Sequence, residues 1–296
     1  MLKRLALVLS IVLLAAACSD SDDASEPASG SSSSADTTSA VNTTDAGETP
    51  VAAIAGGGCD ATAALFITNG SANADLPDPV SSAVCDGDTI VVSSNGIPDY
   101  TYIESSPGTP AEVNLTFNIR ATPVWTEILT DVPALGSAAV ALNGVAIYGP
   151  TEAVGGDVLS LVGALSECGS HNGPTGFHIH LFGTSSATDC IFTPEEVAAE
   201  PQLLGYALDG YPIYTGKNFY TSSWALTDDS LFASDTWSAH SFTEGSGDLD
   251  QCNGLTDADG SYAYYTTDSF PYILGCYHGE VDLDAAGGGG GELGNR

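Results

Sequence analysis

Three histidines that lie within ten positions are the residues of this chain best suited to carry chemistry. The chain has 296 residues and only five histidines, and His171, His178 and His180 all fall in the stretch CGSHNGPTGFHIHLFG. Neutral imidazole is the commonest side chain for binding zinc, copper, iron or nickel. This spacing therefore predicts a site for a divalent transition metal, with zinc or copper first.

The segment from Phe177 to Leu181 alternates apolar and histidine residues, which is the pattern of a β-strand. On a strand, His178 and His180 would share one face about 7 Å apart and could converge on one ion. His171 could return across the Gly-Pro loop as a third ligand. Three histidines that leave one position open are typical of a catalytic metal site rather than a closed structural one.

The alternative is that the three histidines hydrogen-bond to tyrosine, asparagine and aspartate side chains and hold a polar interior together. His240 and His278 stand alone in the sequence. We expect them to be surface or hydrogen-bonding residues, although either could supply a fourth ligand in space.

The N-terminus has the layout of an export signal. Lys3 and Arg4 precede an apolar run that ends in Ala-Ala-Ala-Cys18. This segment is too short to be a membrane-spanning helix. The ending resembles a bacterial lipobox and predicts Cys18 as a lipidation site, the alternative being an ordinary cleaved signal. Residues 19–57 are predicted to be a disordered acidic tether and residues 285–296 a disordered glycine-rich tail. The expected location is the cell envelope, on the extracytoplasmic side.

The charge of the chain excludes several classes of partner. Loss of Lys3 and Arg4 with the signal leaves three basic residues against 38 acidic ones, a formal charge of −35. Nucleic acid and anionic membrane surfaces would be repelled. We therefore expect membrane contact through the lipid anchor alone and no nucleic-acid partner, with any protein or glycan partner unspecified.

Six cysteines remain after Cys18, an even number in an exported chain. Consecutive spacings of 26, 22 and 24 residues favour local pairing. The predicted disulfides are Cys59–Cys85, Cys168–Cys190 and Cys252–Cys276.

The chain also contains an internal resemblance. ALNGVAIY (residues 141–148) returns as ALDGYPIY (207–214), and a later Leu-x-x-Cys segment precedes a candidate strand in each copy. We predict two similar halves, about 139–190 and 205–276, although Asn-Gly and Asp-Gly turns between apolar runs could produce similar hairpins by chance. In the second copy Leu255, Ala263 and Tyr265 replace the three histidines, so metal chemistry would belong to the first half. Asp209 and Asp250 of the second half could hold the metal ligands in place.

The pattern predicts a mainly β fold with one or two short helices, in one disulfide-stapled, internally duplicated domain over residues 58–284. The clearest helix begins at Thr193-Pro194-Glu195-Glu196 and runs to about Leu204, and a weaker one covers 157–165. Segments rich in β-branched and aromatic residues predict strands in these ranges: 89–92, 113–119, 139–148, 176–182, 204–214 and 261–266.

Together these stretches resemble the YHYH domain family of exported bacterial proteins. The resemblance covers roughly 95–279 and rests on NGIP (95–98), LNGV (142–145), the Cys168 to His180 block, GYALDGYPIY (205–214), LDQCNG (249–254) and PYILGC (271–276). The tetrad that names the family is Phe177-His178-Ile179-His180 here, and its later counterpart is Tyr262-Ala263-Tyr264-Tyr265. The resemblance implies fold and export more than a reaction.

Three functions compete. The first is an anchored protein that binds a transition metal for handling or sensing. The second is a metal-dependent hydrolase or oxidase with Asp209 or Glu167 as base. The third is a protein- or carbohydrate-binding module in which the histidines are structural. No serine-hydrolase elbow, P-loop or dinucleotide fingerprint occurs, and the acidic loop Asp257–Gly260 is expected to be a plain turn.

Overall fold

The computed structural model of the protein describes residues 51–52, 58–106 and 108–287, all of which belong to one compact unit, Glu48–Arg296. The export signal, Cys18, most of the predicted tether and the end of the predicted tail lie outside the described residues. Within the described part, no helix has the length and apolar character that crossing a membrane would need.

The fold is mainly β, as predicted. Its largest sheet has nine strands in the order β1-β15-β11-β10-β6-β7-β9-β8, with β14 paired to β15. These strands are β1 (Val51–Ala52), β6 (Ser137–Ala141), β7 (Ala146–Tyr148), β8 (Ser170–Gly173), β9 (Gly176–Ile179), β10 (Leu203–Ala207), β11 (Pro212–Tyr214), β14 (Gly254–Thr256) and β15 (Ser261–Tyr265). Every residue of β6 is buried, so the hydrophobic core lies against the middle of this sheet.

Two hairpins occupy the centre of the sheet. The ranges 139–148 and 204–214, each predicted as one strand region, are each two strands because a turn interrupts them. Gly144 and Gly210 sit in these turns with φ of 84° and 96°, in the left-handed region that favours glycine. Asn143 and Asp209 precede them, and the side-chain Oδ1 of each accepts a hydrogen bond of 3.2 Å from the backbone two residues on.

Strand pairing follows the same order in both halves of the sheet. β7 pairs in parallel with β9, and β11 pairs in parallel with β15. β8 and β14 then add to the outer strands antiparallel. The halves meet where β6 and β10 pair antiparallel, with Val140 opposite Tyr206. A duplicated chain would pair in this way, and the duplication itself stays a prediction.

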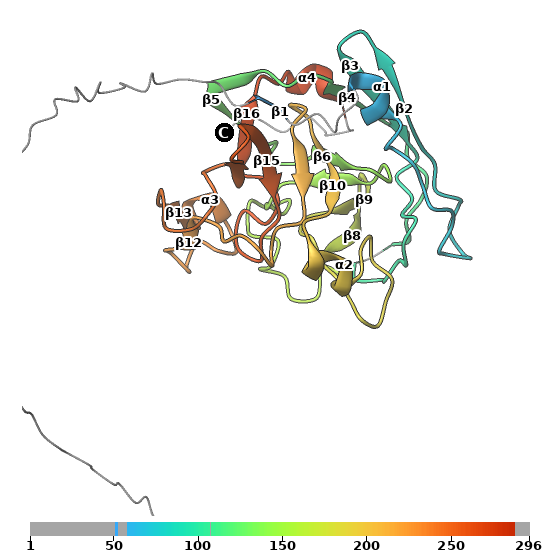
Figure 1. The fold of residues 1–296 in the computed structure, drawn as a ribbon. Helices are drawn as coiled ribbons and strands as arrows, with labels where there is room; N and C mark the ends of the chain where they lie inside the picture. The colour runs from blue at the N-terminus through green and yellow to red at the C-terminus, as the bar shows by residue number, and fades with distance from the viewer. Residues whose placement is uncertain (1–50, 53–57, 107, 288–296) are drawn as a thin grey trace, which may run out of the picture. The chain divides into compact units, whose positions relative to one another are not determined.

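Three smaller sheets accompany the large one. A three-stranded sheet comprises β2 (Ser81–Asp86), β3 (Thr89–Ser94) and β4 (Leu115–Arg120), and α1 (Gly58–Ala63) and α4 (Leu283–Ala286) lie beside it (Figure 1). β5 (Trp125–Asp131) pairs with β16 (Cys276–Gly279), and β12 (Trp224–Leu226) pairs with β13 (His240–Phe242) next to α3 (Thr236–Ala239). The described residues thus contain four short helices, where one or two were predicted.

The helix predicted at Thr193 is present but shorter. α2 covers Pro194–Ala199, and Thr193 and Glu196 form the predicted capping box. The helix ends before Pro201, because a residue that precedes proline disfavours the helical conformation. The weaker helix predicted at 157–165 is wrong, since this segment forms turns. Asp157 does not begin a helix there; its buried carboxylate accepts hydrogen bonds from Tyr272 and Thr236, at 2.7 and 2.6 Å.

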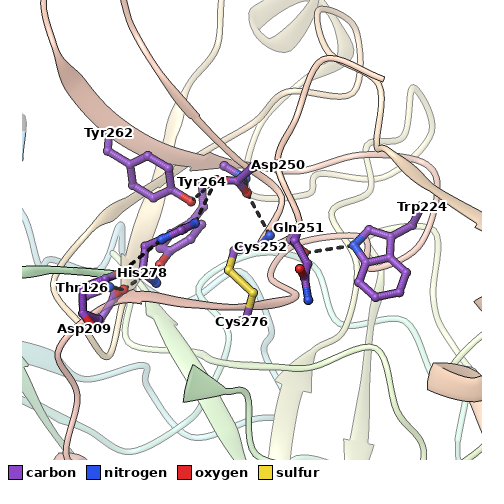
Figure 2. Close-up of a disulfide and its surroundings, with 12 residues drawn as sticks. Thr126, Asp209, Trp224, Asp250, Gln251, Cys252, Tyr262, Tyr264, Cys276 and His278 are labelled. Carbon is purple, nitrogen blue, oxygen red and sulfur yellow. Dashed lines mark hydrogen bonds and ion pairs between the residues drawn. A yellow bond between two sulfur atoms is a disulfide. The ribbon is translucent and has the colours of Figure 1, made fainter. Parts of the chain in front are cut away.

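All three predicted disulfides are present: Cys59–Cys85, Cys168–Cys190 and Cys252–Cys276. Cys59–Cys85 joins α1 to β2 and is half-buried. Cys252–Cys276 is buried and joins the turn before β14 to the first residue of β16, as Figure 2 shows. Every cysteine in the described residues is therefore bridged, which leaves none of them as a thiolate ligand for a metal.

Candidate metal centre

The three predicted histidines converge in space. β8 and β9 form a tight antiparallel hairpin in which His171 lies directly opposite His178, and His180 follows one residue after the end of β9. The Nε2 atom of His178 lies 2.9 Å from Nε2 of His171 and 3.1 Å from Nε2 of His180. All three side chains are buried. The folded chain thus aims three imidazole nitrogens at one point.

Backbone carbonyls fix the tautomers of two of these rings. Nδ1 of His178 donates to the carbonyl oxygen of Gly176 at 2.9 Å, and Nδ1 of His180 donates to that of Gly149 at 2.7 Å. A carbonyl oxygen only accepts, so both Nδ1 atoms carry the proton and both Nε2 atoms of the neutral rings present lone pairs. Metal-binding histidines are usually oriented in this manner, by a hydrogen bond from the other ring nitrogen.

Two lone pairs 3.1 Å apart repel each other unless something positive lies between them. In a tetrahedral zinc site with Zn–N bonds of about 2.0–2.1 Å, neighbouring nitrogen ligands are about 3.3 Å apart. The observed spacings of 2.9 and 3.1 Å come close to this value. The donor set therefore fits a cation with imidazole ligands and would be strained without one.

Burial also keeps the rings neutral, which is the form that binds metal. Loss of hydration on burial lowers the pKa of His180 to about 4. Burial, and then the neighbouring rings of His180 and His171, lower the pKa of His178 well below its ordinary range. Burial lowers the pKa of His171 as well, against the opposing effects of Glu152 and Ala164.

The histidines form part of the wall of a pocket of about 440 Å³. The ring of Tyr148 also lines it and stacks on His178, with ring centres 4.0 Å apart. Glu152 lines the same pocket, and its Oε1 atom lies 3.9 Å from Nε2 of His171. Glu152 was not among the predicted site residues, because no motif connects it to the histidines. It lies just before the segment 157–165 that was predicted as a helix.

The structure does not bring the other predicted residues to this cluster. Glu167 is exposed and lies outside the pocket lining. His240 is buried and, of the two roles expected for it, has the hydrogen-bonding one: its Nδ1 donates to the carbonyl oxygen of Thr236. Neither His240 nor His278 belongs to the group whose ligand atoms surround one point.

Asp209, Asp250 and His278 meet in a second cluster, beside the Cys252–Cys276 disulfide (Figure 2). Nε2 of His278 lies 3.3 Å from Oδ2 of Asp250, which also accepts from the Tyr262 hydroxyl at 2.8 Å. The Trp125 ring stacks on His278 with centres 4.1 Å apart. Asp250, Cys252 and His278 lie close enough together to hold a metal, but Cys252 is bridged, and the Asp250 carboxylate and the His278 imidazole are already engaged with each other.

Asp209 is the most enclosed acid of the second cluster. Its Oδ2 accepts hydrogen bonds from the Tyr264 hydroxyl at 2.6 Å and from the Gly279 backbone at 2.9 Å. Burial raises its pKa to about 6, and the hydrogen bonds oppose this rise. Asp209 therefore helps to join the hairpin turn to β15 and β16 rather than to hold the metal ligands.

Replacing Tyr264 with Phe should destabilise the protein by about 3 kcal/mol at pH 7.5, because a charged buried carboxylate loses its hydroxyl donor and His278 N–H loses its acceptor. The raised pKa means that the carboxyl is neutral at low pH and becomes charged as the pH rises through about 6. We therefore expect a smaller loss at pH 5, measured by urea unfolding at both pH values.

Tyr211→Phe is the matched control, since the neighbouring Tyr211 hydroxyl is buried without a hydrogen-bond partner among the described residues. Its effect should stay within about 0.5 kcal/mol. Equal losses in the two variants would show that the Tyr264 hydrogen bonds contribute nothing.

Comparison with known proteins places this chain in one protein family. The family model of the YHYH protein matches residues 116–279, which is more than half of the chain and contains every strand from β5 to β16. No curated protein and no solved structure is similar enough to count as a match. The matched range includes the three histidines, Glu152 and the second cluster. The chain belongs to the YHYH protein family.

Proposed function

We propose that this protein binds one divalent transition metal ion through Nε2 of His171, His178 and His180. One observation carries the proposal: two histidines whose tautomers are fixed by backbone carbonyls face each other with lone pairs 3.1 Å apart. A cation between them turns this repulsion into attraction. Zinc and copper are the first candidates, because imidazole suits both.

A second candidate, a metal-dependent hydrolase or oxidase, is favoured by the pocket beside the cluster. Three protein ligands leave a position open for water or substrate, as in catalytic zinc sites. Asp209 does not suit the role of general base in such an enzyme, because its carboxylate accepts hydrogen bonds from Tyr264 and Gly279 in the second cluster. Glu152 is the acid that lines the pocket.

The third hypothesis, a binding module with an aromatic contact surface, has less support. Most of the described tyrosines are buried in the core rather than displayed at the surface: Tyr100, Tyr148, Tyr206, Tyr211, Tyr262, Tyr264, Tyr265, Tyr272 and Tyr277.

The test is elemental analysis of the full chain, purified without an affinity tag or chelator and then offered zinc, copper, iron and nickel in turn. We expect close to one metal ion per chain. A protein that stays empty with every metal would overturn the proposal and return the histidines to a structural role.

Metal binding should persist at mildly acidic pH. The lowered pKa values of the three histidines keep protons from competing, so we expect affinity to fall less than about tenfold between pH 7.5 and 5.5. Three histidines with ordinary pKa values near 6.5 would lose roughly 1,000-fold. Competition titration with a chromophoric chelator at the two pH values measures the difference, and a 1,000-fold loss would contradict the burial argument.

We further propose that the protein is anchored in the cell envelope through a lipid on Cys18, a position that lies outside the described residues. Support comes from the signal-like N-terminus. Cys18→Ser should move the protein from the membrane fraction to the soluble fraction, assayed by fractionation and immunoblot. Unchanged membrane attachment of this variant would contradict a lipid anchor at Cys18.

A further inference from the structure

The pocket beside the histidines is mostly apolar. Its volume of about 440 Å³ lies in the range of small-molecule sites. The apolar lining comes from Leu135, Ala153, Leu161, Ala164, Pro174 and the ring of Tyr148. No lysine or arginine lines it, so no cationic side chain of the wall would pair with a phosphate or carboxylate group. The pocket suits a ligand whose body is apolar.

The turn-rich segment beside the pocket is also apolar at its surface. Leu161, which lines the pocket, is 58% exposed, and in the same turn-rich segment Val154 and Val162 are 78% and 102% exposed. Exposed apolar side chains that cluster in one segment often mark a binding site. Contact with these apolar side chains would favour the binding of an apolar ligand and would not favour a charged one.

Glu152 is the exception in this wall. Its Oε1 atom is buried and has no hydrogen-bond partner among the described residues. A buried acceptor without a donor costs about 1–3 kcal/mol, so its persistence calls for a partner that binds. The atom is 3.9 Å from Nε2 of His171, and Glu152 does not belong to the group of ligand atoms that surround one point. Glu152 therefore lies beside the histidine cluster rather than within it.

We propose, resting on the metal site above, that the pocket binds a neutral, mainly apolar small molecule that carries a hydroxyl group. The hydroxyl oxygen binds the metal at its open position, and its hydrogen is donated to Oε1 of Glu152. A carboxylate bound to the metal would have no hydrogen for Oε1 of Glu152, and the repulsion between the two negative oxygens would offset part of its attraction to the metal. Glu152 thus selects hydroxyl groups over anions.

The test uses the full-chain protein loaded with zinc and two probes of similar size, 4-methylphenol and 4-methylbenzoate, in isothermal titration calorimetry. The wild type should bind 4-methylphenol at least tenfold more tightly. Glu152→Gln should reverse the preference, because the amide N–H donates to the benzoate carboxylate. The inference is overturned if the wild type binds 4-methylbenzoate as tightly as 4-methylphenol, or if Glu152→Gln keeps the wild-type preference.

Two further variants locate the probe. Ala153 is exposed at the rim of the pocket, so Ala153→Trp should fill it and abolish probe binding while zinc still binds. Val154→Trp, one residue on and outside the lining, is the matched control and should bind the probe normally. Equal probe binding by the two variants would overturn the assignment to this pocket.

A zinc titration of each protein precedes the probe measurements. If the wild type binds no zinc, the metal site and this inference both fail. If zinc binds but the probes show the wrong preference, only the inference about the ligand fails.

Discussion

Replacing His178 with Ala should weaken zinc binding by at least about 100-fold. Structural zinc sites with four ligands contribute about 10–16 kcal/mol, or about 3 kcal/mol for each ligand, and 2.7 kcal/mol corresponds to 100-fold. His178 is the central ring, since its Nε2 lies within 3.1 Å of Nε2 of both other histidines. His171→Ala and His180→Ala should lose affinity to a similar degree, because each removes one of three ligands.

The weaker zinc binding should also reduce the amount by which zinc stabilises the folded protein. At a zinc concentration 100 times the wild-type Kd, binding stabilises the folded protein by about 2.7 kcal/mol. A variant that binds 100-fold more weakly would gain only about 0.4 kcal/mol under the same conditions. Thermal unfolding with and without zinc, together with a competition titration, measures both effects.

His278→Ala is the matched control, because it removes a half-buried imidazole that stacks on Trp125 and lies outside the cluster. It should lower the stability of the zinc-free protein but leave zinc affinity within about threefold of the wild type. A control that loses zinc as readily as His178→Ala would show that the measured binding is not at the three-histidine cluster.

Removing the buried disulfide by Cys252→Ser/Cys276→Ser should cost about 5 kcal/mol of unfolding free energy. Opening a loop of 24 residues contributes about 3 kcal/mol through the unfolded chain. The rest comes from the two serine hydroxyls, which would replace side chains that are 0% and 4% exposed in an apolar setting. A loss of this size is a large part of the 5–15 kcal/mol that stabilises a typical domain.

Cys59→Ser/Cys85→Ser separates the two contributions. Its loop of 26 residues is almost the same length, but both cysteines are half-buried, so the hydroxyls stay hydrated. We expect a loss of about 3 kcal/mol, measured by urea unfolding of the oxidised proteins. If the two pairs cost the same, burial of the Cys252–Cys276 bridge contributes nothing beyond loop closure.

The local features of the fold could be predicted from the sequence because their causes are local. The capping box at Thr193 and Glu196 depends on residues three apart, and it is present. The turns at Asn143-Gly144 and Asp209-Gly210 also depend on adjacent residues, although they were considered only as the alternative to a duplication, and each divides a range that was predicted as one strand. The alternation of Phe177, His178, Ile179 and His180 depends on the two-residue period of a strand, and β9 covers three of these four residues.

Predictions that needed distant contacts were less successful. The segment 157–165 has a helical pattern but forms turns, and Asp157 is drawn into hydrogen bonds with Tyr272 and Thr236, which are 115 and 79 residues away. Asp209 was expected near the histidines, yet Tyr264 and Gly279 hold it in the second cluster. Neither pairing leaves a periodic trace in the sequence, because such contacts are set by packing.

The sequence by itself determined the family, the mainly β class, the disulfide pairing and the three histidines, since each depends on residue type and short spacing. Only the tertiary structure decided that the histidines share one point. The β8–β9 hairpin sets His171 opposite His178, and the Gly149 carbonyl, 31 residues before His180, fixes the tautomer of that ring. It also decided the place of Glu152, which the turns of residues 150–165 carry to the pocket wall. Spacing along a chain limits which ligands are possible, but directions in space, and therefore lone pairs and their partners, exist only once the chain has folded.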